Sequence, residues 1–207
     1  MVKRLDVEFQ SEGDTVRGWL YLADESKRSP TVVLAGGWCY VREIVMPVYA
    51  QAFAEAGINA MIFDYRNLGA SDGHPRQELD PWKQTEDIRH AVTYAQTLPS
   101  VDPERIGVWG TSFSGGHCLV VGATDRRVKC VAVQMPTISG HWSGLRRVPM
   151  EQIPAVTASL AADRLGRMRG ESPTLRPIVG EPDSRPIYQS EEVRSWFDKL
   201  TPGAPSW

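Results

Sequence analysis

The feature that most constrains this chain is an apolar run that stops at a glycine and is followed two positions later by a serine. Residues 105–117 read RIGVWGTSFSGGH, and 106–109 have the apolar, β-type character of a buried strand. Small residues follow Ser112, where a helix must begin against that strand. A sharp strand-to-helix turn lifts a serine hydroxyl above the sheet edge, with the positive end of the helix beneath it. The stretch therefore predicts a nucleophile elbow.

Two serines compete for the role of nucleophile in this motif. The sequence departs from G-x-S-x-G because Ser114 stands where the second glycine is usual. Counted from the end of the strand, Ser112 falls at the turn, whereas Ser114 falls inside the first helical turn. We therefore predict Ser112 as the nucleophile. The alternative is a Gly/Ser-rich loop that only connects a strand to a helix, or that cradles an anion at the helix N-terminus.

Composition limits the kind of protein this is. With 207 residues, 42% of them hydrophobic, the chain can build one α/β domain with a sizeable core. A net charge of −2 with interspersed acids and bases argues against nucleic-acid and anionic-membrane partners. The N-terminus lacks a signal-peptide hydrophobic region, and Cys39, Cys118 and Cys130 form no metal-binding spacing. We expect a cytoplasmic protein with free thiols.

Hydrophobic patterning predicts alternating strands and helices before residue 136. Residues 5–9 and 15–22 alternate around a turn at 12–14, which is typical of a hairpin. Three further runs are apolar on both faces, as buried parallel strands are: 31–35, 58–64 and 128–135. Helical spacing covers 47–56 and 80–98. The pattern predicts a mostly parallel sheet covered on both faces.

The character of the chain changes after residue 136. Residues 137–207 are rich in Pro, Arg, Ser and Glu, with helical stretches at 154–168 and near 191–200. We interpret 1–136 as the core domain and 137–207 as a cap or lid.

Four stretches, taken together, resemble a known family. They are 32–38, 63–73, 102–110 and the elbow, in the order and spacing of the α/β-hydrolase superfamily. The similarity is greatest to dienelactone-hydrolase-like and acyl-peptidase-like serine hydrolases, which include fungal polyketide transferases. The resemblance implies a three-layer α/β sandwich that hydrolyses a small ester or thioester through an acyl-enzyme at Ser112. It implies neither a metal nor an organic cofactor.

The same resemblance implies where the oxyanion is held. In this family the loop after the corresponding strand usually reads His-Gly-x, and the backbone N–H of x pairs with that of the residue after the serine. Here Gly36 replaces the histidine, Gly37 is kept and Trp38 is x. Because backbone donors do not depend on the side chain, Trp38 and Phe113 are the implied oxyanion donors.

The family pattern breaks where the triad acid and base should follow. A serine needs a general base, and in this family the order along the chain is Ser, acid, His. We expect surface or packing roles for the four histidines, which are His74, His90, His117 and His141. No strand-like run able to carry the acid and the base follows residue 135. Residues 176–183 mimic a strand that ends in an acid, but they are too short and too broken by proline, so we interpret them as cap sequence. The sequence thus predicts that the last two family strands are absent, that acid and base come from elsewhere, and that 128–135 is an exposed edge through which two copies pair.

Two other functions stay open at this stage. One is a catalytically dead remnant that binds a ligand or partner, since no base is found for Ser112. The other is an acyltransferase of polyketide biosynthesis, in which an alcohol replaces water as the acceptor.

Overall fold

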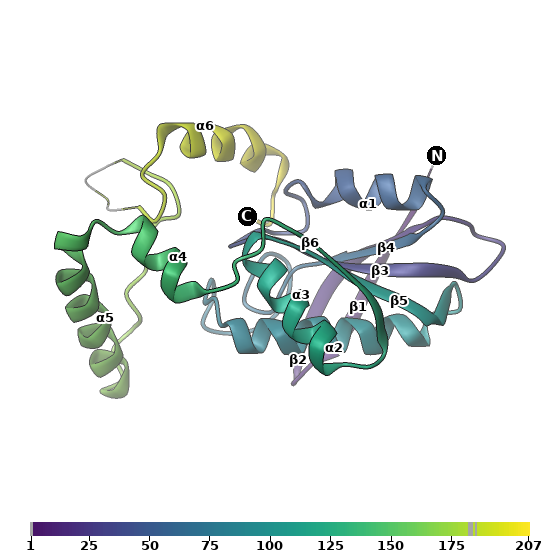
Figure 1. Ribbon diagram of the computed structural model, residues 1–207, viewed down its shortest axis with the longest axis horizontal. Coiled ribbons are helices and arrows are strands. Elements are labelled where there is room, and N and C mark those ends of the chain that lie inside the picture. Colours follow the sequence, from purple (N-terminus) through teal and green to yellow (C-terminus); the bar gives the residue numbers. More distant parts are fainter. Residues whose placement is uncertain (1, 182–183, 185) are drawn as a thin grey trace. The chain divides into compact units, whose positions relative to one another are not determined.

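The computed structural model describes residues 2–181, 184 and 186–207. The chain forms two compact units. The core unit comprises the residues up to Ile138 together with Thr201–Trp207, and the cap unit is Ser139–Leu200. The core unit is built on a six-stranded sheet in the order β1-β2-β4-β3-β5-β6 (Figure 1).

The sheet begins with the expected hairpin. Strands β1 (Lys3–Ser11) and β2 (Asp14–Leu22) are antiparallel, and their register ends with Ser11 opposite Asp14. The two turn residues, Glu12 and Gly13, both have positive φ, 48° and 97°. A two-residue turn of this kind matches the twist of the flanking strands, which explains the position of the glycine.

The remaining strands form the parallel part of the sheet. They are β3 (Ser29–Ala35), β4 (Asn59–Phe63), β5 (Val101–Thr111) and β6 (Val128–Gln134). Strand β3 pairs in parallel with β4 and β5, and β6 pairs in parallel with β5. Every residue of β4 is buried, in keeping with the apolar side chains that follow Asn59 in this strand. The predicted mostly parallel sheet is confirmed.

Helices cover both faces of the sheet. Helix α1 (Met46–Glu55) lies on one face, and α2 (Pro81–Thr97) and α3 (Ser112–Thr124) lie on the other (Figure 1). Neighbouring residues of β4 serve opposite clusters, because Met61 packs with the α2 and α3 side and Ile62 with the α1 side. The structure is therefore the three-layer sandwich that the sequence predicted.

A buried polar network joins three parts of the core unit. Asp87 of α2 accepts hydrogen bonds from Ser11 Oγ (2.5 Å) and Arg66 Nε (2.7 Å). Arg66 also donates from Nη2 to Ser11 Oγ (2.9 Å) and from Nη1 to Glu12 (2.6 Å). Because the side chains of Asp87 and Arg66 are 0% and 5% exposed, each charge depends on the other for stabilisation. The network fixes the loop after β4 to the hairpin and to α2.

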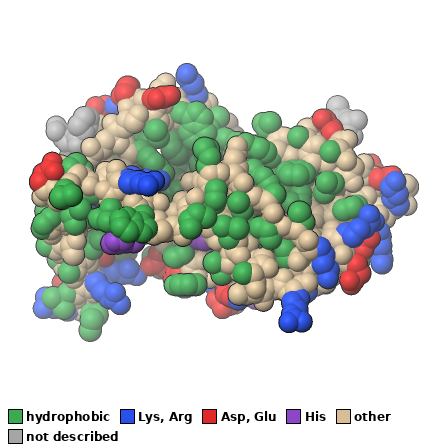
Figure 2. All heavy atoms as spheres, in the orientation of Figure 1, with side chains coloured by type: hydrophobic (Ala, Val, Ile, Leu, Met, Phe, Trp, Pro, Cys, Tyr) green, Lys and Arg blue, Asp and Glu red, His purple; other side chains and the backbone are tan. Residues whose placement is uncertain are grey.

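The cap unit is mainly helical and thinly packed. Its elements are α4 (Gly140–Arg147), η1 (Met150–Gln152), α5 (Ile153–Met168) and α6 (Glu191–Leu200). Helix α4 was not anticipated, since two glycines weaken its helical pattern, but Ser139 caps it by accepting from Trp142 N (3.2 Å). Within the described cap residues, only Gly166, Pro186 and Phe197 are buried. Hydrophobic side chains accordingly remain exposed over this unit (Figure 2).

The described residues contain neither a helix that could span a membrane nor a metal-binding cluster. None of the helices there combines the length and the apolar character needed to cross a bilayer. That part of the chain also contains no group of three or more His, Cys, Asp or Glu side chains arranged to hold a metal ion.

The Asp87–Arg66 pair gives a prediction about stability. Asp87→Ala leaves the Arg66 guanidinium buried without its main counter-charge, so it should lower the free energy of unfolding by about 3 kcal/mol or more. The matched control is Glu25→Ala, which removes a pair with Lys3 in which both side chains are about half exposed and should change little. Urea unfolding followed by circular dichroism measures both. Equal effects of the two substitutions would contradict the role assigned to the network.

Candidate active site

Ser112 lies at the junction of β5 and α3 in a strained backbone conformation. Its φ is 53°, in the left-handed region that non-glycine residues seldom adopt, and its side chain is half-buried. Such a conformation costs of order 1–3 kcal/mol and persists only where the surroundings enforce it. The sharp reversal expected from the sequence motif is therefore present at Ser112. Ser114, the other serine of the motif, is not among the described residues with positive φ.

Close packing enforces the turn. A Cβ at Gly110 would lie 2.7 Å from Cys118 Sγ, so only glycine lets α3 approach the end of β5 this closely. On the other side, the backbone N–H of Thr137 donates to the carbonyl oxygen of Ser112 (2.8 Å). The segment after β6 thus holds the turn from outside while Gly110 makes room for it from inside.

Ser114 is part of the packing beneath the turn. It is fully buried, and the Tyr65 hydroxyl donates to Ser114 Oγ at 2.8 Å. Burial raises the pKa of Tyr65 well above its ordinary value, so the phenol keeps its proton and remains the donor. No pattern in the sequence predicts this contact, because Tyr65 falls in a loop. A serine in place of the usual glycine is explained by this bond.

The loop after β3 reaches the turn. We call residues 36–45 the oxyanion loop, because this segment contains Trp38, which the sequence predicts to be an oxyanion donor. A Cβ at Gly37 would lie 3.6 Å from Ser112 Cβ, and the indole of Trp38 packs on the Phe113 ring with centroids 4.9 Å apart. The structure therefore brings together Trp38, Phe113 and Ser112, the three residues predicted to form the site.

Asp64 fixes the oxyanion loop. Its carboxylate accepts from the backbone N–H of Arg42 (2.5 Å) and of Ala70 (3.0 Å), and it pairs with Arg42 Nη1 at 3.2 Å. Asp64 is completely buried, and this burial raises the pKa of its carboxyl group, while the Arg42 contacts oppose the rise. The carboxylate therefore joins two loops through these contacts.

The histidines of the core unit are engaged elsewhere. His117 Nε2 lies 3.0 Å from Gln84 Oε1, and burial lowers the pKa of His117 to about 4, so the ring is neutral near pH 7. His90 Nδ1 lies 2.8 Å from Ser11 Oγ, and His74 is exposed. In the cap unit, His141 is exposed and contacts Trp142. Across the described residues, no hydrogen bond links a histidine to Ser112.

Comparisons with known proteins were made on sequence and on structure. Residues 1–179 match the family described as Esterase FrsA-like. Thiohydrolase aneE of Aspergillus aculeatus is 38% identical over 207 residues, covering 95% of this chain and 64% of that protein. Polyketide transferase grgF of a Penicillium species is 35% identical over 184 residues, covering 88% and 60%.

A solved structure agrees with these relatives. The crystal structure of the α/β hydrolase GrgF from Penicillium sp. sh18 superposes with a TM-score of 0.80 at 31% identity, over 99% of this chain and 68% of that one. The resemblance to α/β-hydrolases and fungal polyketide transferases is thereby confirmed. The chain spans less than two thirds of the length of either curated relative named above.

The buried His117 predicts a dependence of stability on pH. Because its pKa is about 4 in the fold and about 6.5 when unfolded, the unfolded chain binds the proton more readily between these values. Stability should therefore fall as pH drops from about 6.5 to about 4, by up to roughly 3 kcal/mol from this residue. His117→Gln should abolish this part of the slope in denaturant unfolding, whereas the exposed His141→Gln should retain it. An unchanged slope in His117→Gln would refute the assignment.

Proposed function

Because the chain belongs to the FrsA-like esterase family and has the α/β-hydrolase fold, we propose that it carries the nucleophile and oxyanion hole of a serine acyl hydrolase acting on small esters or thioesters. The observation that carries this proposal is the positive φ of Ser112 at the tip of the turn between β5 and α3. A turn that served only as a connection would have no reason to retain this strain at a non-glycine residue.

The proposed chemistry follows from the groups around Ser112. Its Oγ attacks the acyl carbon while a general base takes the hydroxyl proton. The carbonyl oxygen becomes an oxyanion, and the N–H groups of Trp38 and Phe113 donate to it. Collapse of this intermediate breaks the ester or thioester bond, and the base returns its proton to the departing alcohol or thiol. Water then hydrolyses the acyl-Ser112 ester and regenerates the enzyme. These reaction steps require neither a metal nor an organic cofactor.

The general base and its acid are proposed to come from residues outside the core unit. His90 and His117 are already hydrogen-bonded to other partners, and His117 is too weak a base near pH 7. The two curated relatives are longer than the matched region, which covers 64% and 60% of their lengths. A longer chain, or a second one, has ample sequence to supply an aspartate and a histidine.

Acyl transfer is the second candidate function. It is favoured by the relative named as a polyketide transferase, which matches 88% of this chain. In that reaction an alcohol attacks the acyl-Ser112 ester in place of water. The ratio of hydrolysis product to alcohol ester, measured over increasing alcohol concentration, separates the two activities.

A third reading is a binding protein without catalytic activity. It is favoured by the described histidines, none of which is bonded to Ser112. A protein of this kind would react poorly with a covalent serine probe, because nothing would activate Ser112.

We also propose that two copies associate through β6. This strand ends the sheet, and its exposed residues are Lys129, Cys130, Val131 and Ala132, of which only Lys129 is charged. The opposite edge, β1, exposes mainly charged residues, which discourage pairing, namely Lys3, Arg4, Asp6 and Glu8. An apolar edge strand is a template for a further strand.

The three free cysteines, two of them buried, accord with a reducing compartment such as the cytoplasm.

Substitution of the two serines tests the nucleophile. In a form that includes the base and acid, Ser112→Ala should abolish labelling by a fluorophosphonate and reduce turnover by on the order of 10⁴- to 10⁶-fold. Ser114→Ala should retain labelling, since it removes only the bond from Tyr65. The 207-residue chain should hydrolyse a p-nitrophenyl ester little above background. An adduct mapped to Ser114 would overturn the assignment, and Ser112-dependent turnover by this chain would make His141 the candidate base.

The oxyanion loop is tested at Trp38. Trp38→Phe preserves the backbone donor and should leave turnover of the active form within about tenfold of the parent. Trp38→Pro deletes the N–H and should cost roughly 10²-fold or more. If both substitutions cause equal losses while circular dichroism shows intact folds, the indole is the important group and the backbone assignment fails.

Association through β6 is tested by adding a charge to the edge. Ala132→Lys should shift the chain toward monomer in sedimentation-velocity experiments, because pairing would bury the ammonium groups of both copies. The matched control is Ala52→Lys on the exposed surface of α1, which should leave the distribution unchanged. A parent chain that is monomeric at all concentrations would contradict the proposal.

A further inference from the structure

Two adjoining cavities of the cap unit differ in their charge. Both are lined by Pro186, Tyr188, Gln189 and Ser190, so the segment 186–190 separates one from the other. Backbone bonds hold this segment in place, from Ile187 N to the Pro177 carbonyl (3.0 Å) and from Tyr188 N to the Ile178 carbonyl (2.9 Å). The wall between the cavities is therefore a defined part of the fold.

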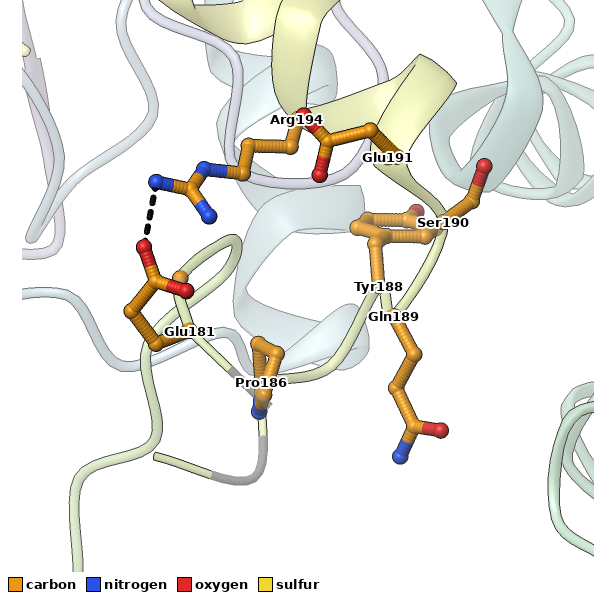
Figure 3. A pocket seen from close by; sticks show the side chains of 8 residues that line it. Glu181, Pro186, Tyr188, Gln189, Ser190, Glu191 and Arg194 are labelled. Carbon is orange, nitrogen blue, oxygen red and sulfur yellow. Dashed lines mark ion pairs between the residues drawn. The ribbon is translucent and has the colours of Figure 1, made fainter. Parts of the chain in front are cut away.

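The smaller cavity neutralises its own charge. It has a volume of about 410 Å³ and contains one arginine, Arg194, whose Nη2 pairs with Glu181 at 2.7 Å. Figure 3 shows these two side chains pointing toward each other, with Glu191 close to Arg194. The described residues that line this cavity therefore leave no positive charge for a ligand to neutralise.

The larger cavity contains two arginines and lacks a carboxylate among its described lining residues. Its volume is about 720 Å³, within the range of small-molecule sites, and its lining includes Arg147 and Arg176. The Arg147 guanidinium lies 5.4 Å from the Tyr188 ring centroid, and Arg176 Nη2 donates to Ser159 Oγ at 3.4 Å. Both partners are uncharged, so each guanidinium is oriented but keeps its charge and most of its donors.

The remainder of this lining is largely apolar. Its apolar side chains include Val148, which follows α4, Ala155 and Val156 of α5, and Ile187. An apolar wall next to two cations matches a ligand with a hydrocarbon part and an anionic end. Guanidinium groups bind phosphate and carboxylate oxygens in a bidentate fashion, which gives the anion a definite place.

The geometry points to this cavity as a binding site for an acyl chain or other hydrocarbon that carries a phosphate or carboxylate, held by Arg147 and Arg176. The inference rests on the proposed function, because it gives the substrate class of the proposed acyl hydrolase. The binding itself does not require the hydroxyl of Ser112.

The test measures binding by isothermal titration calorimetry at low and at physiological ionic strength. Octyl phosphate and octanoate are the anionic probes, and 1-octanol is the uncharged one. We expect at least one anion to bind with saturation, more weakly at higher salt, and 1-octanol to bind much less well. Preference for octyl phosphate identifies a ligand with a phosphate end, and preference for octanoate identifies one with a carboxylate end.

Variants assign the binding to the two arginines. Arg147→Gln and Arg176→Gln should each raise the Kd of the preferred anion roughly tenfold. Arg146→Gln, at an exposed neighbouring position of the same helix but outside the lining, should leave the Kd unchanged. Thermal unfolding by circular dichroism checks that the variants remain folded. Absence of saturable binding by either anion, equal binding of 1-octanol, or an equal loss in Arg146→Gln overturns the site.

Ser112→Ala separates this inference from the proposed function. The variant should bind the preferred anion as the parent does while failing to react with a fluorophosphonate. In a form that includes the base and acid, anion binding without labelling of Ser112 would support the cavity and count against the proposed chemistry. Labelling without anion binding would do the opposite.

Discussion

The reversal of the chain at Ser112 is the constraint on which the proposed site depends. A non-glycine residue with φ of 53° needs continuous support, and the fold supplies it from three directions. Gly110 lets α3 approach β5, Tyr65 donates to Ser114 below the turn, and Thr137 bonds to the carbonyl of Ser112 above it. Residues from three separate parts of the chain thus meet at one strained peptide. The backbone that carries the Ser112 side chain is thereby held in its strained conformation.

Buried carboxylates organise the loops around that turn. Asp64 binds the oxyanion loop to the segment after β4, and Asp87 binds Arg66 of that segment to α2 and to the hairpin. Burial alone raises the pKa of both carboxyl groups, and the arginine and hydrogen-bond contacts oppose that rise. These charges are costly to bury, and they fix loop geometry that apolar contacts would leave less defined.

The cap unit buries far fewer of its residues than the core unit does. The core unit buries two apolar clusters, one on each side of its sheet, whereas few described cap residues are buried. What the cap presents instead is accessible surface, including a cavity with two arginines that have no acidic partner among the described residues. Rigid scaffolds commonly carry binding surfaces on less densely packed segments. We propose that the core unit carries out the chemistry and that the cap unit selects the substrate.

The sequence by itself determined the layers, the parallel strands and the position of the reactive turn. These features follow from local patterns: apolar runs define buried strands, and the small residues around Ser112 permit a sharp reversal. Tertiary structure alone decided the contacts between distant residues, such as Tyr65 with Ser114 and His117 with Gln84. It also decided that Arg147 and Arg176 line one cavity while Arg194 finds Glu181 in the next. Such pairings depend on how chain segments pack in three dimensions, and no residue spacing along the sequence encodes them.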